Sequence, residues 1–188
     1  MAEEVQNTPQ ATISVPDIMF HMRQRVEKKG KKKKGEDANP YEWVYNKSSD
    51  LFAGKKVVVV GLPGAFTPTC TNAQLPGFEE LAQSFYDKGV DEIWCTSVND
   101  AFVMHQWAEH LGIKNVKMLP DGSGEFAASI GMLVDKTNLG FGKRSWRYAI
   151  VIDDLKITGS LVEAGLQDKS PLDPYELTKP EFVLENLL

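Results

Sequence analysis

A run of four valines, Val57–Val60, constrains the fold of this chain more than any other feature. β-Branched residues favour strands, and an uninterrupted apolar run is typical of a strand that is buried on both faces, as in a parallel sheet. Pro63 and Gly64 follow the run and end the strand, because proline lacks an amide donor and both residues favour turns. The sequence therefore predicts a buried strand over residues 57–62.

A helix is predicted directly after this strand, over residues 70–88, where large apolar residues recur at helical spacing. Pro76 lies inside it and predicts a kink or interruption near Gly77. Cys70 lies where the strand turns into the helix. The first helical turn has free backbone N–H groups and a partial positive charge, and both favour a thiolate over a thiol.

The remaining pattern alternates strands with helices and predicts an α/β fold, with a sheet covered by helices on both faces. Near the N-terminus, residues 13–15 and 18–20 predict short strands, and residues 41–45 predict a partner that closes a β-hairpin. Further strands are expected at residues 93–98, 116–119, 148–152 and 156–163. Further helices are expected at residues 101–111, at 125–130 and after a capping box at 178–181. Loops are expected at residues 140–143 and 164–177.

The string from Pro63 to Cys70 reads Pro-x-x-x-Thr-x-x-Cys and supplies groups for attack on a peroxide. Pro63 is suited to shield the sulfur from water. The Thr67 hydroxyl can donate to the sulfur and accept from a peroxide oxygen. Backbone amides near Cys70 can hold the departing oxygen as charge builds on it. A buried structural cysteine in a capping turn is the alternative, and only the complete string argues against it.

This string resembles the active-site signature of the peroxiredoxins, and with the following Gln74–Phe78 it resembles the type II (peroxiredoxin-5-like) group. The resemblance extends from about Tyr41 to the C-terminus and includes the segments 89–93, 97–100, 119–122 and 144–148. It implies a thioredoxin-like fold with a central mixed sheet and an N-terminal β-hairpin addition. It also implies a homodimer and a reaction that needs no metal, haem or flavin.

By position in the family's motifs, Cys70 matches the peroxidatic cysteine, Thr67 the motif threonine and Pro63 the motif proline. Arg147 matches the family's active-site arginine. From the residues alone, Arg147 opens the apolar strand 148–152, where its guanidinium could either reach the sulfur of Cys70 or form a structural ion pair.

Cys95 is the second of two cysteines and follows Cys70 by 25 residues, inside a predicted strand. Some type II relatives carry a cysteine in this segment, which implies a possible resolving role through a disulfide with Cys70. A residue held in a central strand cannot approach its partner without local unfolding, and a disulfide requires the two Cα atoms to lie within about 7 Å. We favour a small buried apolar role for Cys95, and the resolving role remains the alternative.

Length and composition suit one α/β domain over residues 1–188, with frayed residues 1–10. Residues 23–34 carry eight Lys and Arg against one Glu, and we interpret residues 28–36 as an inserted, solvated basic loop. A nucleic-acid-binding patch is the alternative, but no aromatic residues interleave the lysines. No apolar run approaches a membrane span, and no signal peptide is recognisable, so we expect a cytoplasmic protein.

The sequence thus predicts a thiol peroxidase that reduces hydrogen peroxide and alkyl hydroperoxides through Cys70, with no cofactor. The expected reductant is glutathione, glutaredoxin or thioredoxin. The alternative is a peroxide sensor or holdase that relays oxidation to a partner protein, with the basic loop as a docking element. A thioredoxin-like disulfide reductase is disfavoured, because the chain has no Cys-x-x-Cys pair.

Overall fold

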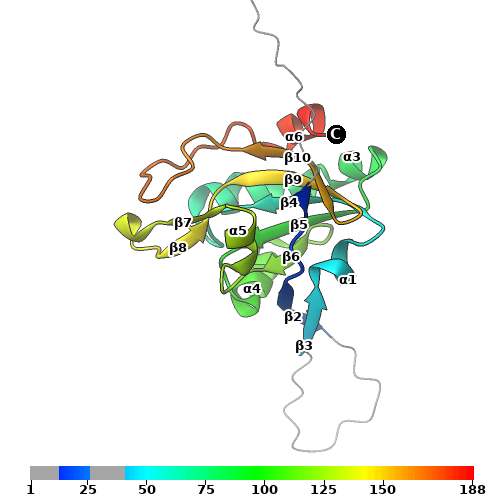
Figure 1. The fold of residues 1–188 in the computed structure, drawn as a ribbon, viewed down its shortest axis with the longest axis horizontal. Coiled ribbons are helices and arrows are strands. Elements are labelled where there is room, and N and C mark those ends of the chain that lie inside the picture. The colour runs from blue at the N-terminus through cyan, green and yellow to red at the C-terminus, as the bar shows by residue number, and fades with distance from the viewer. Residues whose placement is uncertain (1–12, 26–40) are drawn as a thin grey trace, which may run out of the picture.

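A six-stranded sheet forms the centre of the computed structural model, which describes residues 13–25 and 41–188 (Figure 1). The strand order is β1-β10-β9-β4-β5-β6, and β4, β5 and β6 are parallel whereas β9, β10 and β1 pair antiparallel. The bounds are β1 (Ile13–Ser14), β4 (Lys56–Gly61), β5 (Glu92–Ser97), β6 (Lys117–Pro120), β9 (Tyr148–Asp153) and β10 (Lys156–Val162). The expected mixed sheet is confirmed.

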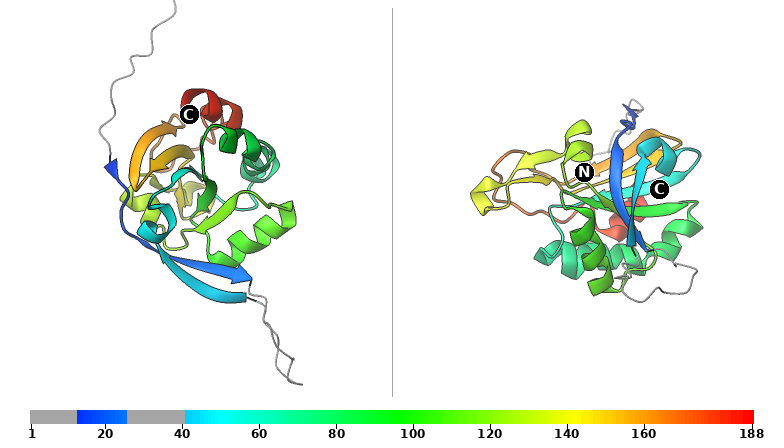
Figure 2. Two further views of the ribbon diagram at one scale, coloured as in Figure 1. Left: turned by 90° about the vertical axis from the view of Figure 1, so that its right-hand side faces the viewer. Right: turned by 90° about the horizontal axis from the view of Figure 1, so that it is seen from below.

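The valine run lies in β4, near the middle of the sheet, and separates two apolar cores. Val58 and Val60 face the core that contains residues of four helices, whereas Val57 and Val59 face the other core with residues of two helices. Figure 2 shows these helices on opposite sides of the sheet. The first set is α2 (Leu75–Glu80), α3 (Ala82–Asp87), α4 (Ala101–Leu111) and α6 (Pro180–Asn186), and the second is α1 (Ser48–Phe52) and α5 (Glu125–Ser129).

The predicted N-terminal hairpin is present as a separate two-stranded sheet of β2 (Met19–Arg25) and β3 (Tyr41–Lys47). Phe20 attaches it to the body, because its buried ring meets Phe126 edge-on with centroids 5.6 Å apart. The basic loop 28–36 and the N-terminal residues 1–10 lie outside the described residues. Among the helices of the described segments, none combines the length and the apolarity that crossing a membrane requires.

The segment after β4 is interrupted, as Pro76 predicted for the helix over 70–88, but the interruption lies elsewhere than expected. The segment comprises a π-helical turn, η1 (Cys70–Gln74), then α2, and after a break at Leu81 the helix α3. Pro76 explains the wide turn, because in a regular α-helix its ring would collide with the carbonyl four residues earlier. In η1 the amide of Leu75 instead bonds to the carbonyl of Cys70. The interruption therefore precedes Pro76 and recurs at Leu81, not at Gly77.

Two further expectations were wrong in detail. Residues 133–145 hold a small antiparallel pair, β7 (Leu133–Asp135) and β8 (Lys143–Ser145), around a 3₁₀ turn at Thr137–Leu139, so Lys143 is not part of a loop. These strands have three residues each, too few for an alternating pattern. The capping box at 178–181 does not form, because the hydroxyl of Thr178 donates to Glu163 at 2.8 Å instead of capping α6.

Candidate active site

Cys70 lies beyond the C-terminal end of β4, at the first position of η1, and is only 1% exposed. The turn that leads to it contains the buried Pro63 and Gly64 and then Phe66, whose φ of 63° is left-handed. Asn99 stabilises this turn by accepting from the amide of Ala65 at 3.0 Å. Because the first amides of a helical segment lack intrahelical acceptors, the sulfur lies at an end that favours negative charge.

Arg147 reaches Cys70 because of the sheet register. β9 runs antiparallel to β4 and pairs Tyr148 with Gly61, so the residue before β9 lies beside the turn that follows β4. The Nη1 of Arg147 donates to the Sγ of Cys70 at 3.5 Å across 77 residues of sequence. The structure thus brings these two predicted site residues together.

The guanidinium of Arg147 has further partners and is 1% exposed. Its Nη1 also donates to the Oε1 of Gln74, its Nη2 forms an ion pair with Asp173, and the ring of Tyr175 lies 5.6 Å away. Burial lowers the pKa of Arg147, but the charges of Cys70 and Asp173 and the hydrogen bonds to them outweigh burial and raise it above its ordinary value. A permanent positive charge therefore lies against the sulfur.

Sequence reasoning missed Gln74 and Asp173 as members of this site. Gln74 lies four residues after Cys70, so helical spacing signals that both can share one face. Asp173 lies in the loop between β10 and α6 and carried no sequence signal. Its Oδ2 accepts from the Oγ1 of Thr69 at 2.9 Å, so its carboxylate contacts both Arg147 and the residue just before Cys70.

Thr67 and Pro63 also lie in the turn before Cys70. The expectation that the Thr67 hydroxyl donates to the sulfur differs from the structure, in which Oγ1 donates to the carbonyl of Gly64 at 2.8 Å. The carbonyl of Thr67 in turn accepts from the amide of Thr71 at 3.0 Å. With its proton engaged, the Thr67 hydroxyl keeps lone pairs that can accept from a peroxide.

Cys95 is fully buried in β5, paired with Val60 of β4 on one side and Met118 of β6 on the other. Both cysteines are free thiols and belong to the same apolar core. Burial, followed by the charge of Cys70, raises the pKa of the Cys95 thiol well above its ordinary value. Cys95 would have to leave two strand ladders to reach Cys70 in a disulfide.

No group of three or more His, Cys, Asp or Glu side chains suits a metal ion within residues 13–25 and 41–188. Two cavities of about 300 and 410 Å³ lie where the β2–β3 hairpin meets the body, and Trp43 and Val44 of β3 line one each. Neither cavity is lined by Cys70 or Arg147.

Comparison with known proteins agrees with this geometry. The family model described as Redoxin matches residues 42–174. "Peroxiredoxin y4vD" of Sinorhizobium fredii is 47% identical over 92% of this chain and 89% of its own length. The chain belongs to the peroxiredoxin family.

Two further relatives of this peroxiredoxin are informative. "Peroxiredoxin-2B" of Arabidopsis thaliana is 51% identical over 61% of this chain and 72% of its own length, in line with the type II resemblance. The chain in the crystal structure of reduced Prx3 from Vibrio vulnificus in complex with H₂O₂ has 35% sequence identity to this chain. The match covers 94% of each chain with a TM-score of 0.76. The peroxiredoxin is therefore a thiol peroxidase with a thioredoxin-like fold.

Proposed function

We propose that Cys70 is the peroxidatic residue and that Arg147 keeps its sulfur anionic. The observation that carries this proposal is the 3.5 Å contact from the Nη1 of Arg147 to the Sγ of Cys70, made by a buried guanidinium. A hydrogen bond from a charged donor favours the charged form of its acceptor. The nucleophile that a peroxidase requires is the thiolate.

In the proposed reaction the thiolate of Cys70 attacks the terminal oxygen of a hydroperoxide ROOH. The S–O bond forms as the O–O bond breaks, and the leaving RO⁻ takes a proton and departs as ROH, which leaves Cys70 as a sulfenic acid. Arg147 and the amides at the start of η1 stabilise charge on the peroxide oxygens. Thr67 accepts from the peroxide, and Pro63 excludes water from the sulfur.

The test is Cys70→Ser in the purified protein. We expect consumption of hydrogen peroxide to fall to the background rate, since serine is not ionised at neutral pH. Consumption at the native rate would refute the assignment of Cys70.

We further propose that an external thiol, from glutathione, glutaredoxin or thioredoxin, reduces the sulfenic acid. The buried position of Cys95 in two strand ladders supports a structural role for that residue. Cys95→Ser is expected to keep turnover with glutathione or glutaredoxin nearly intact while lowering stability. Loss of turnover with an unchanged peroxide step would instead identify Cys95 as a resolving cysteine.

The proposal extends to a single domain over residues 1–188, a reducing cytoplasmic location and a homodimer. β1 is an edge strand of the central sheet, α6 packs on a face of that sheet, and neither cysteine is in a disulfide. Phe66 supports an interface beside the active site, because its ring is 52% exposed and packs on Trp107 and His110 of α4. Sedimentation equilibrium of the native protein and of Phe66→Asp tests the dimer, which the substitution should weaken.

A further inference from the structure

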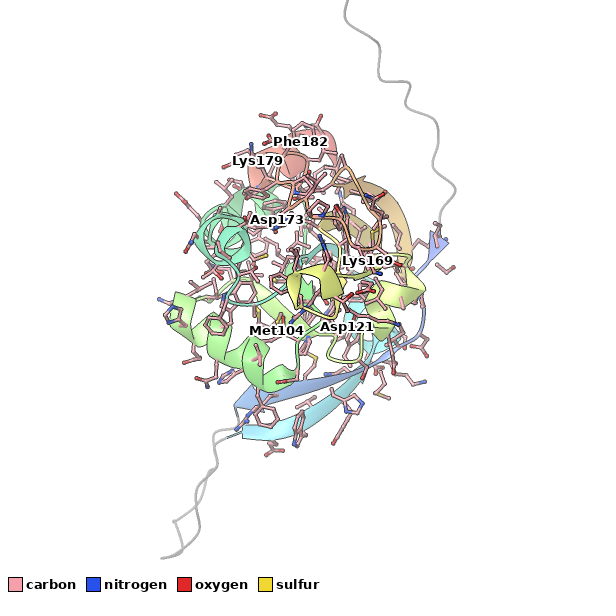
Figure 3. All side chains as sticks on the ribbon, turned by 90° about the vertical axis from the view of Figure 1, so that its left-hand side faces the viewer. Met104, Asp121, Lys169, Asp173, Lys179 and Phe182 are labelled. Atoms are coloured by element: carbon pink, nitrogen blue, oxygen red, sulfur yellow. The ribbon has the colours of Figure 1, made fainter. Side chains whose placement is uncertain are left out.

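Asp173 bridges two parts of the active site that are distant in sequence. One carboxylate oxygen pairs with Nη2 of Arg147, and the other accepts from Oγ1 of Thr69 at 2.9 Å. Thr69 immediately precedes Cys70 and is the N-cap position of η1. Figure 3 shows Asp173 below α6, beside the teal helical segment that follows β4. The Asp173 side chain is 52% exposed, whereas Arg147 is 1% exposed.

The loop that carries Asp173 is fixed independently of these two contacts. On one side, the buried Nζ of Lys136 donates to the carbonyls of Ser170 and Leu172, both at 3.0 Å. On the other, the buried carboxylate of Glu163 accepts from the amides of Glu176 and Thr178 at 2.8 and 2.9 Å. The Asp173 backbone is therefore held between two anchors, and its side chain is presented to the site.

Reduction of oxidised Cys70 requires this site to open. A peroxide has two oxygen atoms, but a reducing thiol is far larger and must approach a sulfur in a residue that is only 1% exposed. The balanced step is Cys70–SOH + RSH → Cys70–S–S–R + H₂O, in which the sulfenic oxygen leaves as water with the thiol proton. Because Thr69 is the N-cap of η1, an opening of that turn that exposes the sulfur would displace Thr69 and break its bond to Asp173.

We propose that Asp173 is a positioning residue that holds η1 closed through Thr69 and orients Arg147 for the peroxide step. This inference rests on the proposed role of Cys70. The two contacts act on different half-reactions. The contact with Arg147 aids attack on peroxide, and the contact with Thr69 slows reduction by a thiol. Loss of both contacts therefore slows the first half-reaction and accelerates the second.

Two substitutions test the contacts: the first removes one contact alone, and the second affects both. Thr69→Val removes the hydroxyl that bonds to Asp173 and leaves the Arg147–Asp173 pair in place. Asp173→Asn removes the charge that pairs with Arg147 and weakens the bond to Thr69. Asp168→Ala is the matched control in the same loop, because Asp168 accepts from the amide of Asp135 and contacts neither Arg147 nor Thr69 in the described structure.

The experiment measures each half-reaction by stopped flow on the full chain. The first mixing gives the rate constant with one equivalent of hydrogen peroxide, and the second mixing gives the rate of reduction by glutathione. Tryptophan fluorescence is a suitable signal for opening of η1, because Nε1 of Trp107 donates to Oγ1 of Thr71, which lies in η1, at 3.1 Å. At excess peroxide, mass spectrometry measures the sulfinic acid that forms when a second peroxide oxidises the closed sulfenic form.

We expect Thr69→Val to accelerate reduction about 2- to 10-fold, the factor for one ordinary hydrogen bond. Asp173→Asn only weakens the bond to Thr69, so it should accelerate reduction by a smaller factor. It should also slow the peroxide step about 3- to 10-fold, because it removes the charge that pairs with Arg147. Both variants should accumulate less sulfinic acid than the native enzyme, and Asp168→Ala should match the native enzyme in all three readouts.

Unchanged half-reactions in both variants would overturn the role of Asp173 while leaving that of Cys70 intact. The same changes in Asp168→Ala would also overturn it, because general loosening of the loop would then explain them. A native enzyme that forms no sulfenic acid at Cys70 would overturn both proposals together.

Discussion

Replacement of Arg147 by methionine tests the electrostatic basis of the site. Methionine keeps an unbranched apolar stem and removes the donors to Cys70, Gln74 and Asp173. A hydrogen bond to a charged group contributes about 1.5–3 kcal/mol. Since about 1.4 kcal/mol corresponds to a factor of ten in rate, loss of the contact with the sulfur should lower the rate constant with hydrogen peroxide about 10- to 150-fold.

The same substitution has a separate effect on stability. Gln74 is fully buried, and its Oε1 would lose the guanidinium that it accepts from. An unsatisfied buried acceptor costs about 1–3 kcal/mol, whereas the half-exposed Asp173 can regain water. Urea denaturation should therefore show a free energy of unfolding lower by about 1–3 kcal/mol, with the fold retained.

Arg144→Met is the matched control. Arg144 is near in sequence, but its Nε and Nη1 donate to the carbonyls of Phe141 and Val98 at 3.0 and 3.2 Å and not to the sulfur. The assay is the second-order rate constant of the first turnover, which excludes effects on reduction. A value for Arg147→Met within twofold of the native enzyme would refute electrostatic activation and leave Arg147 as a structural tie.

Three further outcomes follow from single contacts. Gly61→Ala should destabilise the fold by about 3 kcal/mol or prevent folding, because a Cβ there would lie 2.0 Å from Cε1 of Tyr148 in the central sheet; thermal denaturation measures this. In Glu79→Gln the free energy of unfolding should fall less as the pH is lowered than in the native protein, whereas the control Glu80→Gln should behave like the native protein. Burial raises the pKa of Glu79, but hydrogen bonds from the backbone amides of residues 114–116 and from the side chain of Asn115 outweigh burial and lower this pKa below 4.5. The stability that the ionised Glu79 adds above pH 4.5 is therefore lost as the pH falls through the lowered pKa. Urea titrations at several pH values check this. Asp173→Asn should lower the free energy of unfolding more in a Cys70→Ser background than in the native protein, because Arg147 has no anionic partner in the double variant. Equal losses measured by urea denaturation would contradict this.

Much of the fold could be predicted because its elements follow simple periodicities. The valine run gave β4, and the spacing of apolar residues after Asp100 predicted α4, with Asp100 itself accepting from the amides of Phe102 and Val103. The hairpin of β2 and β3 was also predicted, although its connection lies outside the described residues. Such elements depend on local pattern, which a single sequence displays.

The parts that were missed depend on tertiary contacts. Lys136 and Glu163 are charged residues that sequence patterns place at the surface, yet they are 3% and 2% exposed and anchor the loop before α6. Asp173 lies in that loop, where no periodicity exists, so its approach to Arg147 could not be read from the sequence. The π-helical turn at Cys70 was missed because Pro76 can kink, interrupt or widen a helix, and only packing decides which.

The contacts of Arg147 also explain how one buried cation persists through a cycle that changes the charge beside it. Under the proposed role of Cys70, the guanidinium of the reduced enzyme faces two anions, the sulfur of Cys70 and the carboxylate of Asp173. Oxidation to a sulfenic acid or a mixed disulfide neutralises the sulfur, and an isolated buried guanidinium would then carry a large desolvation cost. In the proposed cycle Asp173 is placed to compensate that charge, because its half-exposed carboxylate pairs with Nη2 of Arg147. Cys70 and Asp173 accept from different nitrogens of the guanidinium, Nη1 and Nη2, so the carboxylate can pair with the cation without displacing the sulfur from its donor.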